Sequence, residues 1–73
     1  MYFEEALKEA RKGKMIKRKS AGRIWRAFKD GYLCDLLKID GKLHFAHTGY
    51  PLTLQAISAD DWCAIELREE MIL

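Results

Sequence analysis

The chain has 73 residues, of which 49% are hydrophobic and 33% are charged, and its formal net charge is +2. This composition is typical of an ordered globular domain and excludes an intrinsically disordered chain. A chain of about this length buries only about 60–65% of the surface that it exposes when unfolded. We therefore expect one domain over residues 1–73 that gains stability by assembling with further copies of itself.

Targeting signals and the pattern of cysteines indicate the cellular compartment in which the protein resides. The N-terminus carries the acids Glu4 and Glu5 instead of the basic region and apolar stretch of a secretory signal. No apolar run approaches the roughly 20 residues that cross a bilayer. Cys34 and Cys63 each lie in an apolar run, which is typical of buried free thiols and not of a disulfide framework. The sequence predicts a cytoplasmic protein without a membrane partner.

An amphipathic helix is predicted over residues 2–12. Phe3, Leu7 and Ala10 recur at helical spacing. Acidic residues stand in its first turn and basic residues in its later part, an order that favours the helix dipole. Gly13 suits the left-handed position that commonly follows a helix.

The remainder of the chain reads mainly as strands, and the expected fold class is α+β. Asp30-Gly31 and Asp40-Gly41 are hairpin signals. Residues 52–58 fit a short strand and a helical turn equally well. The predicted fold is a short N-terminal helix packed on a small antiparallel β-sheet of about five strands. These strands are expected at residues 14–19, 23–28, 32–39, 42–47 and 62–67.

Side-chain alternation along a strand assigns residues to opposite faces of the sheet. In the second predicted strand, Arg26 points to one face and Trp25 to the other. In the last predicted strand, Trp62 shares a face with Ala64, so we interpret Trp62 as structural.

The sequence lacks the patterns of metal binding and of catalysis. His44 and His47 would point to opposite faces of a strand, and no third ligand stands at a suitable spacing. No local motif links a nucleophile to a base, and Gly13-Lys14 lacks the glycine pattern of a P-loop. We therefore expect a protein that is not an enzyme and that holds neither a metal nor a cofactor.

Charge is distributed unevenly along the chain. Residues 1–30 carry ten Lys or Arg against four acids, whereas residues 31–73 carry three against seven. The basic part can attract phosphates, while the acidic part argues against a nucleic-acid binder with one broad positive face. An equally open interpretation is that the opposite charges balance within the domain or between subunits.

Basic and aromatic residues cluster between residues 17 and 26. Guanidinium groups bind phosphate oxygens in bidentate fashion, and an indole face stacks on a base. The alternative for Trp25 is a place in the core with the arginines at its border. The residues predicted to bind a ligand of this kind are Arg18, Arg23, Trp25, Arg26, Thr48 and Asp61.

A family resemblance rests on short motifs at both ends of the chain: Phe3, Ala6-Leu7, Gly13-Lys14, Ile16, Arg18, and Ala59 with Asp61-Trp62. With these residues the chain resembles the second family of Thoeris anti-defence sponges, which phages encode. The resemblance implies an α+β domain that assembles as a homotetramer and captures cyclic ADP-ribose-type immune signals, uncleaved, in pockets between subunits. It also places Arg18 at the family's first-strand arginine.

The chain departs from the family pattern after this arginine. Lys19-Ser20-Ala21-Gly22 stands where the family usually has Gly-Trp-Asn, and Trp25 comes further on. The middle loops, which help to build the family's pocket, are also shorter. The identity of the ligand therefore stays open between a cyclic ADP-ribose-type signal and a cyclic oligonucleotide of CBASS defence.

The leading hypothesis is a non-catalytic phage sponge, dimeric or tetrameric, that sequesters a cyclic nucleotide in the cytoplasm of the infected bacterial cell. Two alternatives use the same residues or the same fold. One is a small nucleic-acid-binding β-barrel, which would use the basic and aromatic cluster. The other is a protein inhibitor that docks an exposed strand edge on a defence enzyme.

Overall fold

A computed structural model describes residues 1–20, 24–46 and 52–72 of the chain, apart from the side chain of Glu69. Its five strands form one antiparallel sheet in the order β4-β3-β2-β1-β5. This arrangement confirms the predicted α+β fold. In chain order the elements are α1 (Phe3–Arg11), β1 (Lys14–Arg18), β2 (Trp25–Lys29), β3 (Tyr32–Ile39), β4 (Lys42–Ala46), α2 (Leu54–Ser58), β5 (Trp62–Glu66) and the 3₁₀ turn η1 (Glu69–Met71).

Helix α1 forms where the sequence predicts it, one residue shorter at each end. Acids occupy its first turn and bases its last turn. Gly13 follows at φ +98°, a backbone conformation that L side chains rarely adopt. Ala6 and Ala10 are buried, and such small side chains allow the helix to lie close to the sheet.

Two tight turns set the register of β2, β3 and β4. Asp30 and Gly31 have φ values of 52° and 84°, and Asp40 and Gly41 have values of 50° and 79°. Positive φ at both central residues defines the hairpin turn whose twist matches that of the flanking strands. Both Asp-Gly predictions are therefore confirmed, and each turn pairs the strand residues on either side of it.

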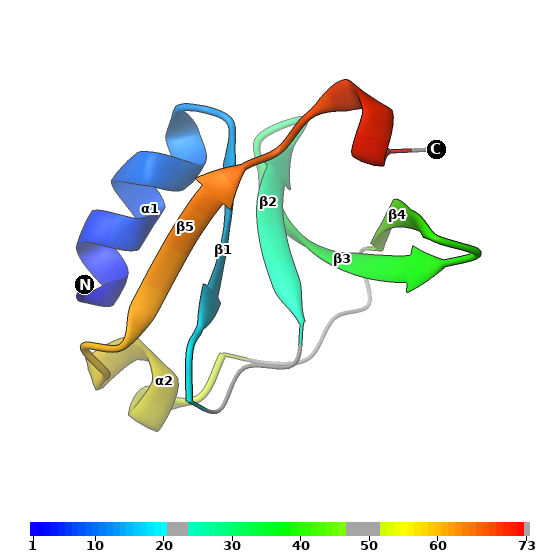
Figure 1. Ribbon diagram of the computed structural model, residues 1–73. Helices are drawn as coiled ribbons and strands as arrows, with labels where there is room; N and C mark the ends of the chain where they lie inside the picture. The colour runs from blue at the N-terminus through cyan, green and yellow to red at the C-terminus, as the bar shows by residue number, and fades with distance from the viewer. Residues whose placement is uncertain (21–23, 47–51, 73) are drawn as a thin grey trace.

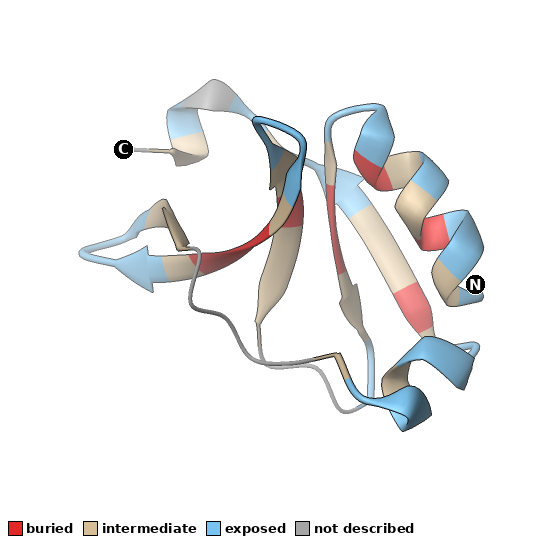
Figure 2. Ribbon diagram, turned by 180° about the vertical axis from the view of Figure 1, so that it is seen from behind, coloured by how far each residue is buried: buried red, intermediate tan, exposed pale blue. Residues whose placement is uncertain are grey.

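The sheet carries a hydrophobic core on each face (Figures 1 and 2). On one face, which we call the helix face, α1 packs beside β1 and β5. On the other, which we call the open face, the C-terminal segment crosses toward β4, where Ile72 forms an isolated bridge with Leu43. The helix-face core consists of Ala6, Ala10, Ile16 and Trp62, and the open-face core of Met15, Ala27 and Leu36 with the half-buried Trp25, Leu43, Phe45, Leu67 and Met71.

Within the ambiguous segment at residues 52–58, Leu54–Ser58 form the short helix α2. The side chain of Thr53 caps this helix, because its hydroxyl oxygen accepts a hydrogen bond from the Ala56 N–H at 3.1 Å. The Ala56 carbonyl in turn accepts a hydrogen bond from the indole N–H of Trp62 at 2.8 Å. This tertiary contact ties α2 to the helix-face core.

Other predictions differ in detail from the structure. Strand β2 begins at Trp25 instead of Arg23, and Arg23 lies outside the described residues. Cys34 is buried as expected, whereas Cys63 is half-buried, and both are free thiols. In the described part of the chain, no helix is long and apolar enough to cross a membrane.

Candidate functional site

Three of the predicted ligand-binding residues lie at one end of the sheet. Arg18 is the last residue of β1, Trp25 is the first of β2, and Asp61 directly precedes β5. Because these strands are antiparallel neighbours, all three positions lie at the same end (Figure 1). We call Lys17, Arg18, Ser20, Trp25 and Asp61 the strand-end site. The predicted residues Arg23 and Thr48 lie outside the described residues.

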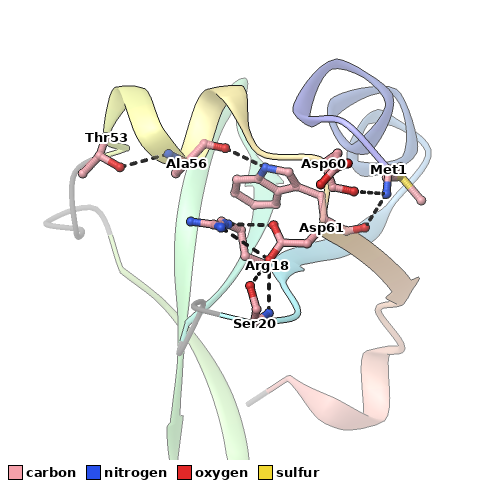
Figure 3. Close-up of polar contacts among 8 residues, drawn as sticks. Met1, Arg18, Ser20, Thr53, Ala56, Asp60 and Asp61 are labelled. Atoms are coloured by element: carbon pink, nitrogen blue, oxygen red, sulfur yellow. Dashed lines mark hydrogen bonds and ion pairs between the residues drawn. The ribbon is translucent and has the colours of Figure 1, made fainter.

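Arg18 and Asp61 form a two-point ion pair in this site (Figure 3). The Arg18 Nε donates to Asp61 Oδ1 at 2.8 Å, and its Nη2 donates to Oδ2 at 3.4 Å. The two side chains are 20% and 23% exposed, so solvent reaches both. The remaining N–H groups of this guanidinium have no hydrogen-bond partner among the described residues. Arg18 can therefore bind an anion while it stays paired with Asp61.

Asp61 is enclosed by hydrogen-bond donors. Besides Arg18, the backbone N–H of Ser20 donates to Oδ2 at 3.2 Å, and the Ser20 hydroxyl donates to the same oxygen. The Arg18 side chain, followed by the Ser20 hydroxyl, holds the pKa of the Asp61 carboxyl well below its usual range. Three of these four bonds end on Oδ2 and one on Oδ1. Asp61 therefore fixes the orientation of the Arg18 guanidinium.

The N-terminus holds the turn that carries Asp61. The Met1 ammonium donates to the carbonyl oxygens of Asp60 and Trp62, each at 3.0 Å (Figure 3). The N–H of Trp62 donates back to the Met1 carbonyl at 3.0 Å. Neither this contact nor that of Ser20 was predicted, because residues 41 to 61 positions apart meet here and no local pattern signals such pairs.

Trp25 lies on the open face, opposite to Arg18. Its ring is half-buried against the open-face core, and the Lys17 ammonium lies 5.4 Å from the ring centroid. This distance permits a cation–π interaction. Trp25 therefore borders the core and is only half-buried. The sequence allowed a core role or a ligand-stacking role for this residue, and its position is compatible with both.

An open cleft of about 650 Å³ lies beside Trp25. Its apolar wall includes Met15, Leu36 and Leu43, and Lys38 contributes a positive charge. The C-terminal segment contributes Met71 and the acidic Glu70 to the lining. Volumes of 300–1,000 Å³ with a mostly apolar lining and a few polar groups are typical of small-molecule sites.

Arg26 has a different setting from Arg18. It lies on the helix face, as alternation predicts, and its Nη1 contacts Asp35 Oδ1 at 3.0 Å. The Asp35 side chain is 2% exposed and that of Arg26 is 13% exposed, so this ion pair is largely buried. The predicted basic and aromatic cluster is thus divided, with Arg18 and Arg26 on one face and Lys17 and Trp25 on the other.

Within residues 1–20, 24–46 and 52–72, no group of three or more His, Cys, Asp or Glu side chains could hold a metal ion. His47, one of the two histidines considered above, lies outside these ranges. Comparisons of the chain with protein-family models, with curated proteins and with solved structures found no match. The fold and the strand-end site are therefore the basis for the functional proposal below.

Proposed function

We propose that this protein is a non-catalytic sponge that binds a cyclic nucleotide immune signal and removes it from solution, as the family resemblance implies. One observation supports the proposal most strongly. The strand-end site combines a guanidinium, some of whose N–H groups have no partner among the described residues, with an indole that borders a cleft of about 650 Å³. A cyclic nucleotide offers the matching groups, which are phosphate oxygens and a flat base.

Each residue of the site has a distinct task in this proposal. Arg18 donates to a phosphate oxygen through the N–H groups that Asp61 leaves unused. Trp25 stacks on the base, and the Lys17 ammonium beside the ring adds positive charge. Asp61 and Ser20 keep the guanidinium in place, so little side-chain freedom is lost on binding.

The division of the site between two faces constrains how a ligand binds. Arg18 and Trp25 point away from each other across the sheet. A single ligand contacts both if it reaches around the strand ends, or if it lies between Arg18 of one subunit and Trp25 of another. The second arrangement accords with a homo-oligomer, dimeric or tetrameric, which we propose as the state of the protein in the cytoplasm of an infected bacterial cell.

Sequestration needs affinity and slow release, and no turnover. A sponge lowers the free signal by mass action, so its effect depends on the dissociation constant and on the off-rate. The pairing of Arg18 with Asp61 supports this proposal, because a side chain already held in position loses little freedom when a ligand binds.

The test is recovery of an unaltered ligand. The purified protein is incubated with a panel of cyclic ADP-ribose-type and cyclic oligonucleotide signals, washed, and denatured by heat. We expect one of these compounds to be released chemically intact, and Arg18→Ala protein to retain much less of it. Failure of every compound to bind, or release of a hydrolysed product, would contradict the proposal.

A nucleic-acid-binding function is the second candidate, because Lys17 and Trp25 place a cation and an aromatic ring together on the open face of the sheet. Salt dependence separates the two functions. A groove along a nucleic-acid backbone contacts many phosphates, so its affinity falls steeply between about 50 and 200 mM salt. A pocket for a small cyclic nucleotide contacts few phosphates, and we expect its binding to persist at about 200 mM salt.

A further inference from the structure

The outer edge of β5 exposes backbone groups. The N–H of Lys19 donates to the Asp61 carbonyl at 2.9 Å, and β1 and β5 pair in continuous register beyond this point. In an antiparallel pair, alternate residues direct their backbone groups toward the partner strand. The odd-numbered residues of β5 therefore face β1, and the even-numbered residues face away from the sheet.

The even-numbered residues of β5 have unequal surroundings. The outward N–H and carbonyl of Trp62 are both bonded to Met1 at 3.0 Å. The outward N–H and carbonyl groups of Ala64 and Glu66 have no hydrogen-bond partner in residues 1–20, 24–46 and 52–72. Between them lies Ile65, a residue that is 44% exposed. Residues 64–66 therefore present four backbone groups without a partner in the described residues, together with one exposed apolar residue.

We infer that this edge pairs with the β5 edge of a second copy of the chain, antiparallel, with a two-fold axis at Ile65. In this register Ala64 lies opposite Glu66 of the partner subunit, and Glu66 lies opposite Ala64 of the partner subunit. Each of these pairs exchanges two N–H···O=C bonds, so all four free groups of each chain are satisfied. Ile65 lies opposite its own copy as a non-hydrogen-bonded pair, with Cα atoms about 4.5 Å apart.

The other symmetric registers are less favourable. An axis at Cys63 or at Ala64 would require the outward groups of Trp62, which Met1 already occupies. An axis at Glu66 would place two carboxylates directly opposite each other, which is destabilising. The axis at Ile65 avoids both problems and also covers the exposed side chain. The contact with Met1 thus marks where the pairing ends.

This interface goes beyond the proposed ligand binding, and its test uses no ligand. Analytical ultracentrifugation of the wild-type protein at about 100 µM should give a mass of at least twice 8.5 kDa. Ile65→Lys sets two ammonium groups face to face at the axis, and we expect it to raise the dissociation constant of this pairing roughly 100-fold. The matched control is Ile39→Lys, at a side chain that is 49% exposed on β3, which should leave the mass unchanged.

A cross-link then tests the register. The expected Cα separation at the axis lies within the range of disulfides, so Ile65→Cys protein should form a covalent dimer under mild oxidation. Ile39→Cys protein should not. A wild-type mass of 8.5 kDa at about 100 µM, or an Ile65→Lys assembly equal to that of the wild type, would overturn the inference. So would equal cross-linking of the two cysteine variants.

Discussion

The two faces of the sheet contain the two tryptophans in opposite circumstances. On the helix face, Trp62 is 3% exposed, its ring centroid lies 4.9 Å from that of Phe3, and its indole N–H is bonded to the Ala56 carbonyl. On the open face, Trp25 is half-buried beside a cleft, and its indole ring lies near the ammonium of Lys17. The same side chain is a core residue in one place and a candidate ligand contact in the other.

The difference between the faces arises from what covers them. The helix face is closed by α1 and α2, whose contacts include buried alanines and the indole hydrogen bond. The open face is covered by the C-terminal segment, which is attached through the Leu43–Ile72 bridge and a 2.7 Å hydrogen bond from the Lys42 ammonium to the Glu70 carbonyl. Both faces therefore carry a core, but only the helix face is covered by helices.

The largest expected effect is that of Trp62→Ala. Loss of a buried aromatic side chain, with the cavity that it leaves, typically costs about 3–5 kcal/mol, a large share of the stability of a small domain. Urea denaturation followed by circular dichroism measures this loss. Trp62→Phe serves as the control because it keeps most of the volume and removes only the indole hydrogen bond. If Trp62→Ala lowered the free energy of unfolding by less than Trp25→Ala does, Trp62 would not be the more important core residue of the two.

Arg18→Ala should act on binding more than on folding. A charge-assisted hydrogen bond to a phosphate contributes enough that its loss should weaken binding of the cyclic nucleotide by about 10- to 100-fold. Calorimetric titration of the ligand and thermal unfolding of the free protein separate the two effects. Arg18→Lys retains the charge without the two-pronged geometry and should fall between the wild type and Arg18→Ala. Equal losses of stability and affinity would identify Arg18 as a structural ion-pair residue.

Trp25→Ala should destabilise the protein by roughly 1–2 kcal/mol, because only part of the ring is removed from water in the folded state. The same change should abolish stacking and weaken binding of the cyclic nucleotide. Urea denaturation and calorimetric titration on one preparation provide both values. If this variant is largely unfolded, and the fraction that stays folded binds the cyclic nucleotide as tightly as the wild type does, then Trp25 is a core residue like Trp62.

The smallest expected effect concerns acid stability. Hydrogen bonds from Lys14, followed by those from Lys12, lower the pKa of Glu9 from 4.5 to about 2, and Arg18 lowers the pKa of Asp61. Because each carboxyl has a lower pKa in the folded state, its contribution to stability is fully present above the unfolded pKa. That contribution is lost as the pH falls through the folded pKa. Thermal unfolding should therefore move to lower temperature below about pH 4.

Asp61→Asn tests how much of this acid dependence belongs to the strand-end site. The variant should be less stable than the wild type at pH 7 and should show a shallower decline between about pH 4 and 2. Glu9→Gln, on α1, is the matched control, because Glu9 forms surface pairs with Lys12 and with Lys14 at the start of β1. An unchanged acid profile in both variants would show that neither carboxyl governs acid stability.

The sequence by itself determined the elements with strong local causes. The charge order and Gly13 predict α1 because the helix dipole and the left-handed C-terminal position act within one or two turns. The Asp-Gly pairs predict both hairpins because few other residues adopt positive φ at low cost. Alternation also placed Trp62 with Ala64, and Arg26 opposite Trp25, since successive side chains of a strand point to opposite faces.

Only the tertiary structure determined which groups the side chains on each face of the sheet contact. Leu54–Ser58, in the ambiguous segment 52–58, form a helix whose Ala56 carbonyl accepts a hydrogen bond from the Trp62 indole N–H. Local propensity does not specify this contact. The ion pair between Asp61 and Arg18, which is 43 positions away, is likewise a contact that local sequence does not specify. Packing and long-range pairing choose among the states that a short sequence allows, because burial and hydrogen bonding of distant groups outweigh weak local preferences.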